Sequence, residues 1–135
     1  MKRVLAVTGY ATVLAVGIAA LPYVSHRVPS TSQVLVHCPN GNQPAFVTPA
    51  QVTIAVGDSI VWRMTGQVAS DTLVISLKDG QQAWPFSGAV PHGKSSARTG
   101  SARVPGTYGY NVDLECRLPG GGTQSVTIDP DIIIE

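Results

Sequence analysis

Charged side chains are scarce in this chain of 135 residues, which has nine Lys and Arg and eight Asp and Glu. Lys2, Arg3 and Arg27 lie in the N-terminal segment, so the rest of the chain holds six basic and eight acidic residues. This part of the chain has a net charge near −2 and no cluster of basic residues, so it lacks the positive surface that binds a phosphate backbone. We therefore expect no nucleic-acid partner.

Short motifs of catalytic and redox sites are also missing. The two cysteines, Cys38 and Cys116, do not form a Cys-x-x-Cys pair, and no Gly-x-Ser-x-Gly elbow is present. Asp113 and Glu115 lie on one side of a strand pattern, where a solvated face is expected rather than a carboxylate pair. We expect no catalytic, cofactor-binding or metal-binding residue, and hence no enzyme.

One phosphate-loop motif is present but lies in the wrong context. The stretch Gly88–Ser95 fits G-x-x-x-x-G-K-S. Such a loop needs a buried strand before it and a helix after it, so that backbone amides face the phosphates. Pro85 precedes the stretch and Gly100 and Pro105 follow it. The sequence therefore predicts an ordinary loop.

The N-terminus carries the longest apolar run. Lys2 and Arg3 precede residues 4–24, which are mostly apolar and form the n-region and h-region of a targeting segment. About twenty apolar residues also suffice to span a bilayer, so residues 1–27 are either a cleaved signal peptide or a retained transmembrane anchor. Both alternatives export the rest to the periplasm or the exterior, with the membrane contacted only through an uncleaved segment. Residues 28–32 are predicted to form a linker.

Residues 33–135 show the pattern of an all-β domain. Short runs alternate apolar and polar residues between Gly, Pro, Asn and Asp, and no ten-residue stretch after position 30 favours a helix. The clearest run places Tyr108, Tyr110 and Val112 on one face, with Leu114 and Cys116 following in the same register. About seven strands are predicted, forming a Greek-key β-sandwich or barrel. Val52, Ile54 and Val56 are expected to share a buried face.

The stretch from Asp79 to Pro105 is rich in Gly, Ser and Pro and is predicted to be a long loop. It contains Trp84, Pro85 and Phe86. We expect their rings to cap the sandwich rather than to bind a ligand.

Cys38 and Cys116 each lie an even number of residues from the apolar residues of their own predicted strand. Side chains two residues apart point to the same face of a strand, so both cysteines are expected to point inward. An even cysteine count in an exported domain predicts a disulfide between them. Buried free thiols are the alternative, and metal or redox chemistry is a weaker one.

Three stretches together resemble the cupredoxin-like family. They are Gln51–Trp62 with its Gly-Asp turn before a Trp strand, Val104–Tyr110 with its Pro-Gly-x-Tyr-x-Tyr start, and Val126–Ile134. The resemblance covers most of residues 33–135 and implies a two-sheet Greek-key sandwich. The apolar segment that precedes it is expected to be a helix, either as a signal peptide or as an anchor.

Copper-binding members of that family hold the metal with a His after the Trp-bearing strand, then Cys, His and usually Met around the loop that closes the late strand. Here no His lies between Arg63 and Val74, and neither His nor Met follows Cys116. A His₂Cys site cannot be assembled in the family's way. The resemblance therefore implies a copper-deficient member.

The sequence thus favours an exported, non-catalytic cupredoxin-like module that binds an unknown protein or small molecule, or acts structurally, in the cell envelope. One alternative is a metal-handling or electron-transfer protein with an unconventional copper site built from His37, His92 or Met64. A second is an immunoglobulin-like adhesion domain, since Cys38, Trp62 and Cys116 suggest an inter-sheet disulfide packed on a Trp.

Overall fold

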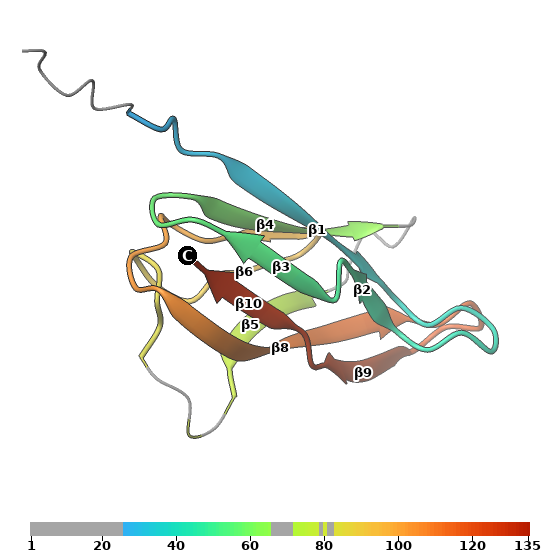
Figure 1. Ribbon diagram of the computed structural model, residues 1–135. Helices are drawn as coiled ribbons and strands as arrows, with labels where there is room; N and C mark the ends of the chain where they lie inside the picture. The colour runs from blue at the N-terminus through green and yellow to red at the C-terminus, as the bar shows by residue number, and fades with distance from the viewer. Residues whose placement is uncertain (1–25, 66–71, 79, 81–82) are drawn as a thin grey trace, which may run out of the picture.

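The computed structural model describes residues 26–65, 72–78, 80 and 83–135, which form ten β-strands and no helix (Figure 1). The apolar segment at 4–24, predicted to be a signal peptide or anchor, lies outside the described residues. Within the described ranges, no helix is both long and apolar enough to cross a membrane.

The strands form two sheets. The first has the order β2-β1-β4-β7, with β1 (Thr31–His37), β2 (Phe46–Thr48), β4 (Ser59–Thr65) and β7 (Ser96–Arg98). The second has the order β3-β10-β8-β5-β6, with β3 (Gln51–Ile54), β10 (Asp131–Ile134), β8 (Gly106–Arg117), β5 (Thr72–Leu77) and β6 (His92–Gly93), and β9 (Thr123–Ile128) also pairs with β8. The predicted all-β, two-sheet sandwich is confirmed.

The structure differs from the prediction in where two sets of strands lie. The stretch 79–105 is not one long loop, because β6 and β7 lie within it and pair with β5 and β4. The strand β1 begins at Thr31, two residues before the expected start of the sandwich at 33. β6 and β7 have only two and three residues, which is too short for an alternation of apolar and polar residues to be recognised in the sequence.

Each sheet contains one parallel pair. β1 lies parallel to β4, with Val34 opposite Trp62, and β10 lies parallel to β3, with Ile132 opposite Val52. Immunoglobulin domains are built from two antiparallel sheets. The parallel pairs therefore argue against the immunoglobulin-like alternative.

The core lies between the sheets and follows the predicted alternation. All five inward residues of β8 from Tyr108 to Cys116 are buried, while Glu115 on the opposite parity is exposed. Val56 is an exception: its side chain is 49% exposed, so the prediction that it joins Val52 and Ile54 is wrong. β3 ends at Ile54, and Val56 lies in the turn that Gly57 makes at a φ of 95°.

The two sheets meet at a buried aromatic pair. Nε1 of Trp62 on β4 donates a hydrogen bond of 3.1 Å to the hydroxyl of Tyr110 on β8, and the rings contact edge to face with centroids 5.6 Å apart. Burial raises the pKa of Tyr110 to about 12 despite this hydrogen bond. The buried indole N–H thus has an acceptor inside the core, as buried polar groups require.

The Trp84-Pro85-Phe86 segment covers one side of this core. Phe86 is 5% exposed and belongs to the buried cluster, and Trp84 packs against that cluster. The two rings are tilted, with centroids 5.1 Å apart. The prediction that these rings cap the sandwich is confirmed.

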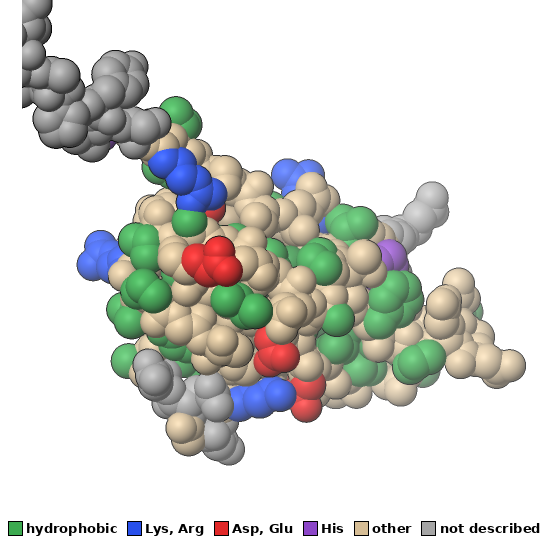
Figure 2. Space-filling view, in the orientation of Figure 1, with side chains coloured by type: hydrophobic (Ala, Val, Ile, Leu, Met, Phe, Trp, Pro, Cys, Tyr) green, Lys and Arg blue, Asp and Glu red, His purple; other side chains and the backbone are tan. Residues whose placement is uncertain are grey.

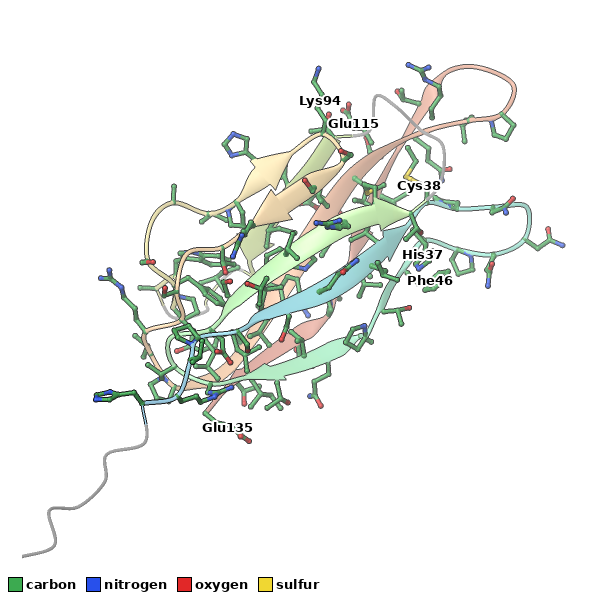
Figure 3. All side chains as sticks on the ribbon, turned by 90° about the horizontal axis from the view of Figure 1, so that it is seen from above. His37, Cys38, Phe46, Lys94, Glu115 and Glu135 are labelled. Atoms are coloured by element: carbon green, nitrogen blue, oxygen red, sulfur yellow. A yellow bond between two sulfur atoms is a disulfide. The ribbon has the colours of Figure 1, made fainter. Side chains whose placement is uncertain are left out.

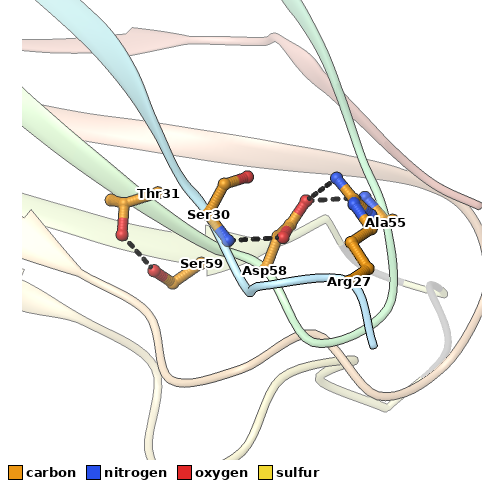
Figure 4. Close-up of polar contacts among 6 residues, drawn as sticks. All are labelled: Arg27, Ser30, Thr31, Ala55, Asp58 and Ser59. Atoms are coloured by element: carbon orange, nitrogen blue, oxygen red, sulfur yellow. Dashed lines mark hydrogen bonds and ion pairs between the residues drawn. The ribbon is translucent and has the colours of Figure 1, made fainter. Parts of the chain in front are cut away.

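The segment before β1 is attached to the domain through Asp58 (Figure 4). The Asp58 side chain is 2% exposed and accepts hydrogen bonds from the backbone amides of Ser30 at 2.7 Å and Ala55 at 3.1 Å. Arg27 completes the arrangement with an ion pair of 2.8 Å. The pKa of Asp58 is lowered, first by the Ser30 amide and further by the Ala55 amide and Arg27, against the opposing effect of burial. Asp58 is thus a structural residue, whose carboxylate bonds the Ala55 amide in its own turn and the Ser30 amide of the segment before β1.

Because the folded pKa of Asp58 lies below its ordinary value of 3.8, its contribution to stability is complete above that pH and is lost as the pH falls through the lower value. We expect Asp58→Asn to reduce the drop in unfolding free energy between pH 5 and about pH 2, measured by urea denaturation. Asp129→Asn, which changes a carboxylate that is 65% exposed, is the control. Equal pH dependence in wild type and Asp58→Asn would contradict this account.

Candidate functional site: the disulfide end of the sandwich

One end of the sandwich is closed by a covalent bond between the sheets. Cys38 directly follows β1, Cys116 lies near the end of β8, and the two residues form a disulfide with a Cα–Cα distance of 5.8 Å. In the described residues no cysteine is free. The predicted pairing is therefore present, and we call this region the disulfide end: residues 37–46, Thr65 and 116–122.

A stacked ring pair lies beside the disulfide (Figure 3). The rings of His37 and Phe46, opposite each other on β1 and β2, are nearly parallel, with centroids 4.1 Å apart and an angle of 8°. Thr65, the last residue of β4, pairs with His37 from the other side and places its hydroxyl 2.6 Å from His37 Nδ1. Three strands of the first sheet thus fix the position of one imidazole.

The Thr65 hydroxyl engages one of the two nitrogens of this imidazole. Its oxygen lies 2.6 Å from His37 Nδ1 and 3.3 Å from the carbonyl oxygen of Val36, and its single hydrogen is donated to one of them at a time. In either case Nδ1 is engaged by Thr65, so Nε2 is the ring nitrogen that a ligand would meet.

These groups line an open cavity of about 380 Å³. Its walls carry the His37–Phe46 stack, two prolines, two side-chain amides and one guanidinium: His37, Cys38, Pro39, Asn40, Gln43, Phe46, Thr65, Arg117 and Pro119. Two tight turns flank it. Asn40 and Gln43 exchange backbone hydrogen bonds of 3.0 Å, and the amide of Gly121 donates to the carbonyl of Leu118 at 3.0 Å.

The volume falls in the range of small-ligand sites, and the lining combines an aromatic surface with a few polar groups, which is the usual composition of such sites. The sequence did not reveal this cavity. Phe46 comes from a strand of three residues, and Arg117 looks like any polar residue at a strand end. A signal that could have pointed to this cavity is that His37 directly precedes Cys38, so that the two side chains lie on opposite faces of the strand.

In the family that the sequence resembles, the copper ligands follow the Trp-bearing strand and surround the loop that closes the late strand, and here β4 and β8 both end at the disulfide end. The donor atoms present at this end do not fit a copper ion. The sulfur of Cys116 is bonded to Cys38, and Nδ1 of His37 is engaged by Thr65. Among the described residues, no group of three or more His, Cys, Asp or Glu is placed to hold a metal ion.

The remaining candidate donors are on other elements. His92 lies on β6 of the second sheet, opposite Val74, whereas His37 is on β1 of the first sheet. Met64 is partly buried against the core. The structure does not gather His37, His92 and Met64 into one site.

Two further motifs have structural settings. Asp113 accepts hydrogen bonds from Thr127 at 2.6 Å and Ser76 at 3.5 Å, so this carboxylate bonds its neighbouring strands. The phosphate-loop motif Gly88–Ser95 contains β6 and is followed directly by strand β7, where a phosphate loop requires a helix. Neither feature builds a reactive site.

No family model matches the chain, and no curated protein matches it. Among solved structures, 22 chains match. One of them is the reduced Cu(I) form of an amicyanin mutant, which is 14% identical, aligns over 75% of this chain and 80% of its own, and has a TM-score of 0.37. The all-β sandwich described above rests on the strand pairing and not on this similarity.

The disulfide predicts a large stability difference. It closes a span of 78 residues, and a loop of that length corresponds to a stabilisation of about 4 kcal/mol through restriction of the unfolded chain. We expect the double variant Cys38→Ala/Cys116→Ala to lose most of this free energy in urea denaturation. Reduction of the wild type with dithiothreitol should give a similar loss and should have no effect on the double variant. A loss below about 1 kcal/mol would show that the bond does not stabilise the sandwich in this way.

Proposed function

We propose that this chain is an exported, non-catalytic, cupredoxin-like module without a type 1 copper site, and that it binds a protein or small-molecule partner at the disulfide end. The observation that carries the proposal is the cavity beside His37 and Phe46 at an end whose cysteine sulfurs are bonded to each other. The disulfide is consistent with an oxidising compartment such as the periplasm or the exterior.

The cavity walls indicate what is bound. The His37–Phe46 stack offers a flat aromatic surface on which another ring or an apolar side chain can lie. Asn40 and Gln43 line the same cavity with amides that donate and accept hydrogen bonds. A partner segment with an aromatic or apolar group and nearby polar atoms fits these walls.

The rigidity of the end supports a binding role. The disulfide joins the two sheets next to the cavity, and the 40–43 and 118–122 turns are closed by their own backbone hydrogen bonds. A site that is held before the partner arrives loses less conformational freedom on binding.

A photo-crosslinking amino acid at position 43 tests this proposal in cells. The backbone hydrogen bonds of Gln43 are kept when its side chain is replaced, and that side chain lines the cavity. We expect irradiation to give a defined adduct, visible as a mass increase of the intact chain for either a protein or a small molecule. Adding Phe46→Ala should reduce its yield several-fold.

The control places the same amino acid at Thr53, an exposed position on β3 outside the cavity lining. Equal adducts at both positions, or an adduct at position 43 that Phe46→Ala leaves unchanged, would contradict a binding site at the disulfide end. Thermal denaturation of each variant verifies that it is folded.

A further inference from the structure

The end of the sandwich opposite the disulfide is unusually apolar at its surface. Val28, Val56 and Val104 are 82%, 49% and 48% exposed, the highest values among the large hydrophobic side chains described. We call this region the valine end: residues 27–30, 55–58 and 102–106. Figure 2 shows apolar and basic side chains together at the end of the domain where β1 begins.

Hydrogen bonds bring these three loops together. Val28 lies between Arg27 and Ser30, which both bind the Asp58 carboxylate. Val56 precedes Gly57, whose amide donates to the carbonyl of Ala102 at 2.9 Å. Val104 lies two residues beyond Ala102. The three valines therefore belong to one surface built around the 57–58 turn.

A long apolar segment directly precedes the residues of this surface in the sequence. Residues 4–24 are mostly apolar, and Arg27 is held to the folded domain by its ion pair with Asp58. Only Ser25 and His26 separate Val24 from Arg27, so the chain can span roughly 11 Å between them. Wherever residues 4–24 enter a bilayer, the valine end is held within about that distance of its surface.

We propose that the valine end docks onto the lipid surface, with Val28, Val56 and Val104 in the interfacial layer, so that the disulfide end faces away from the membrane. This inference rests on the proposed export and on retention of residues 1–25. Apolar side chains beside Arg residues are typical of protein surfaces that lie in the headgroup region.

Charge gives little net attraction at this end. Arg27, Arg98 and Arg103 are opposed by Asp58 and by Glu135, whose carbonyl accepts a hydrogen bond from the Val56 amide at 2.9 Å. Arg98 reaches this end through hydrogen bonds to Thr31 and Ser59. Docking should therefore depend on apolar contact and persist on zwitterionic lipid, where a charge-driven attachment would be lost.

The test uses the full chain in phosphatidylcholine bicelles that contain a gadolinium-chelating lipid. We expect paramagnetic relaxation of backbone amides to be several-fold stronger at 56–57 and 102–104 than at 40–43 and 120–122. The triple variant Val28→Ser/Val56→Ser/Val104→Ser should weaken the relaxation at 56–57 and 102–104 several-fold, because the tether alone keeps this end near the bilayer but does not hold it in the interfacial layer.

The matched control is Val74→Ser/Val90→Ser/Leu118→Ser, which removes the other three exposed large hydrophobic side chains, each 38% or 39% exposed. This variant should keep the contrast. Uniform relaxation in the wild type overturns the proposal, and so does a contrast that the valine-end variant leaves unchanged. A two-fold molecular mass in solution that the valine-end variant loses also overturns it, because the valines then contact a second copy.

A separate measurement tests retention. Mass spectrometry of the protein recovered from an envelope fraction should find peptides from residues 1–25. Recovery only as a soluble chain beginning near Ala20 overturns the docking inference while leaving the binding role of the disulfide end intact.

Discussion

β1 and β8 belong to different sheets, and the Cys38–Cys116 bond holds their ends together. Between the same two layers, the indole N–H of Trp62 donates a hydrogen bond to the Tyr110 hydroxyl within the core. With the sheets fixed at this end, the turns after β1 and β8 lie beside each other and leave the cavity between them. The disulfide thus serves both stability and the shape of the candidate site.

The two ends of the sandwich differ in chemistry. The disulfide end combines an aromatic stack with amides and a guanidinium around a cavity, whereas the valine end exposes aliphatic side chains around the buried carboxylate of Asp58. The strands connect the two ends, since β1 starts directly after Ser30, which binds Asp58, and ends at His37, directly before Cys38. Attachment at the valine end, as proposed, would leave the disulfide end pointing away from the membrane.

The sequence predicted what depends on long alternating runs, and it missed what depends on short pairings. The inward parity of Cys116 followed from the twelve-residue β8, which made the disulfide predictable. The stack of His37 on Phe46 was not predictable, because it needs the three-residue β2 to pair with β1 in one register. Asp58 was recognised as a turn residue, but its ion pair with Arg27, 31 residues away, needs the fold.

Copper binding measured on the purified full-length chain, prepared without reductant, tests the central claim most directly. With Cys116 bonded to Cys38 and His37 engaged by Thr65, the account predicts that added Cu(II) is removed by desalting and gives no strong visible absorption band. Retention of one copper ion per chain with a strong visible band, lost in Cys116→Ala, would contradict the claim that the disulfide end is a copper-free binding site.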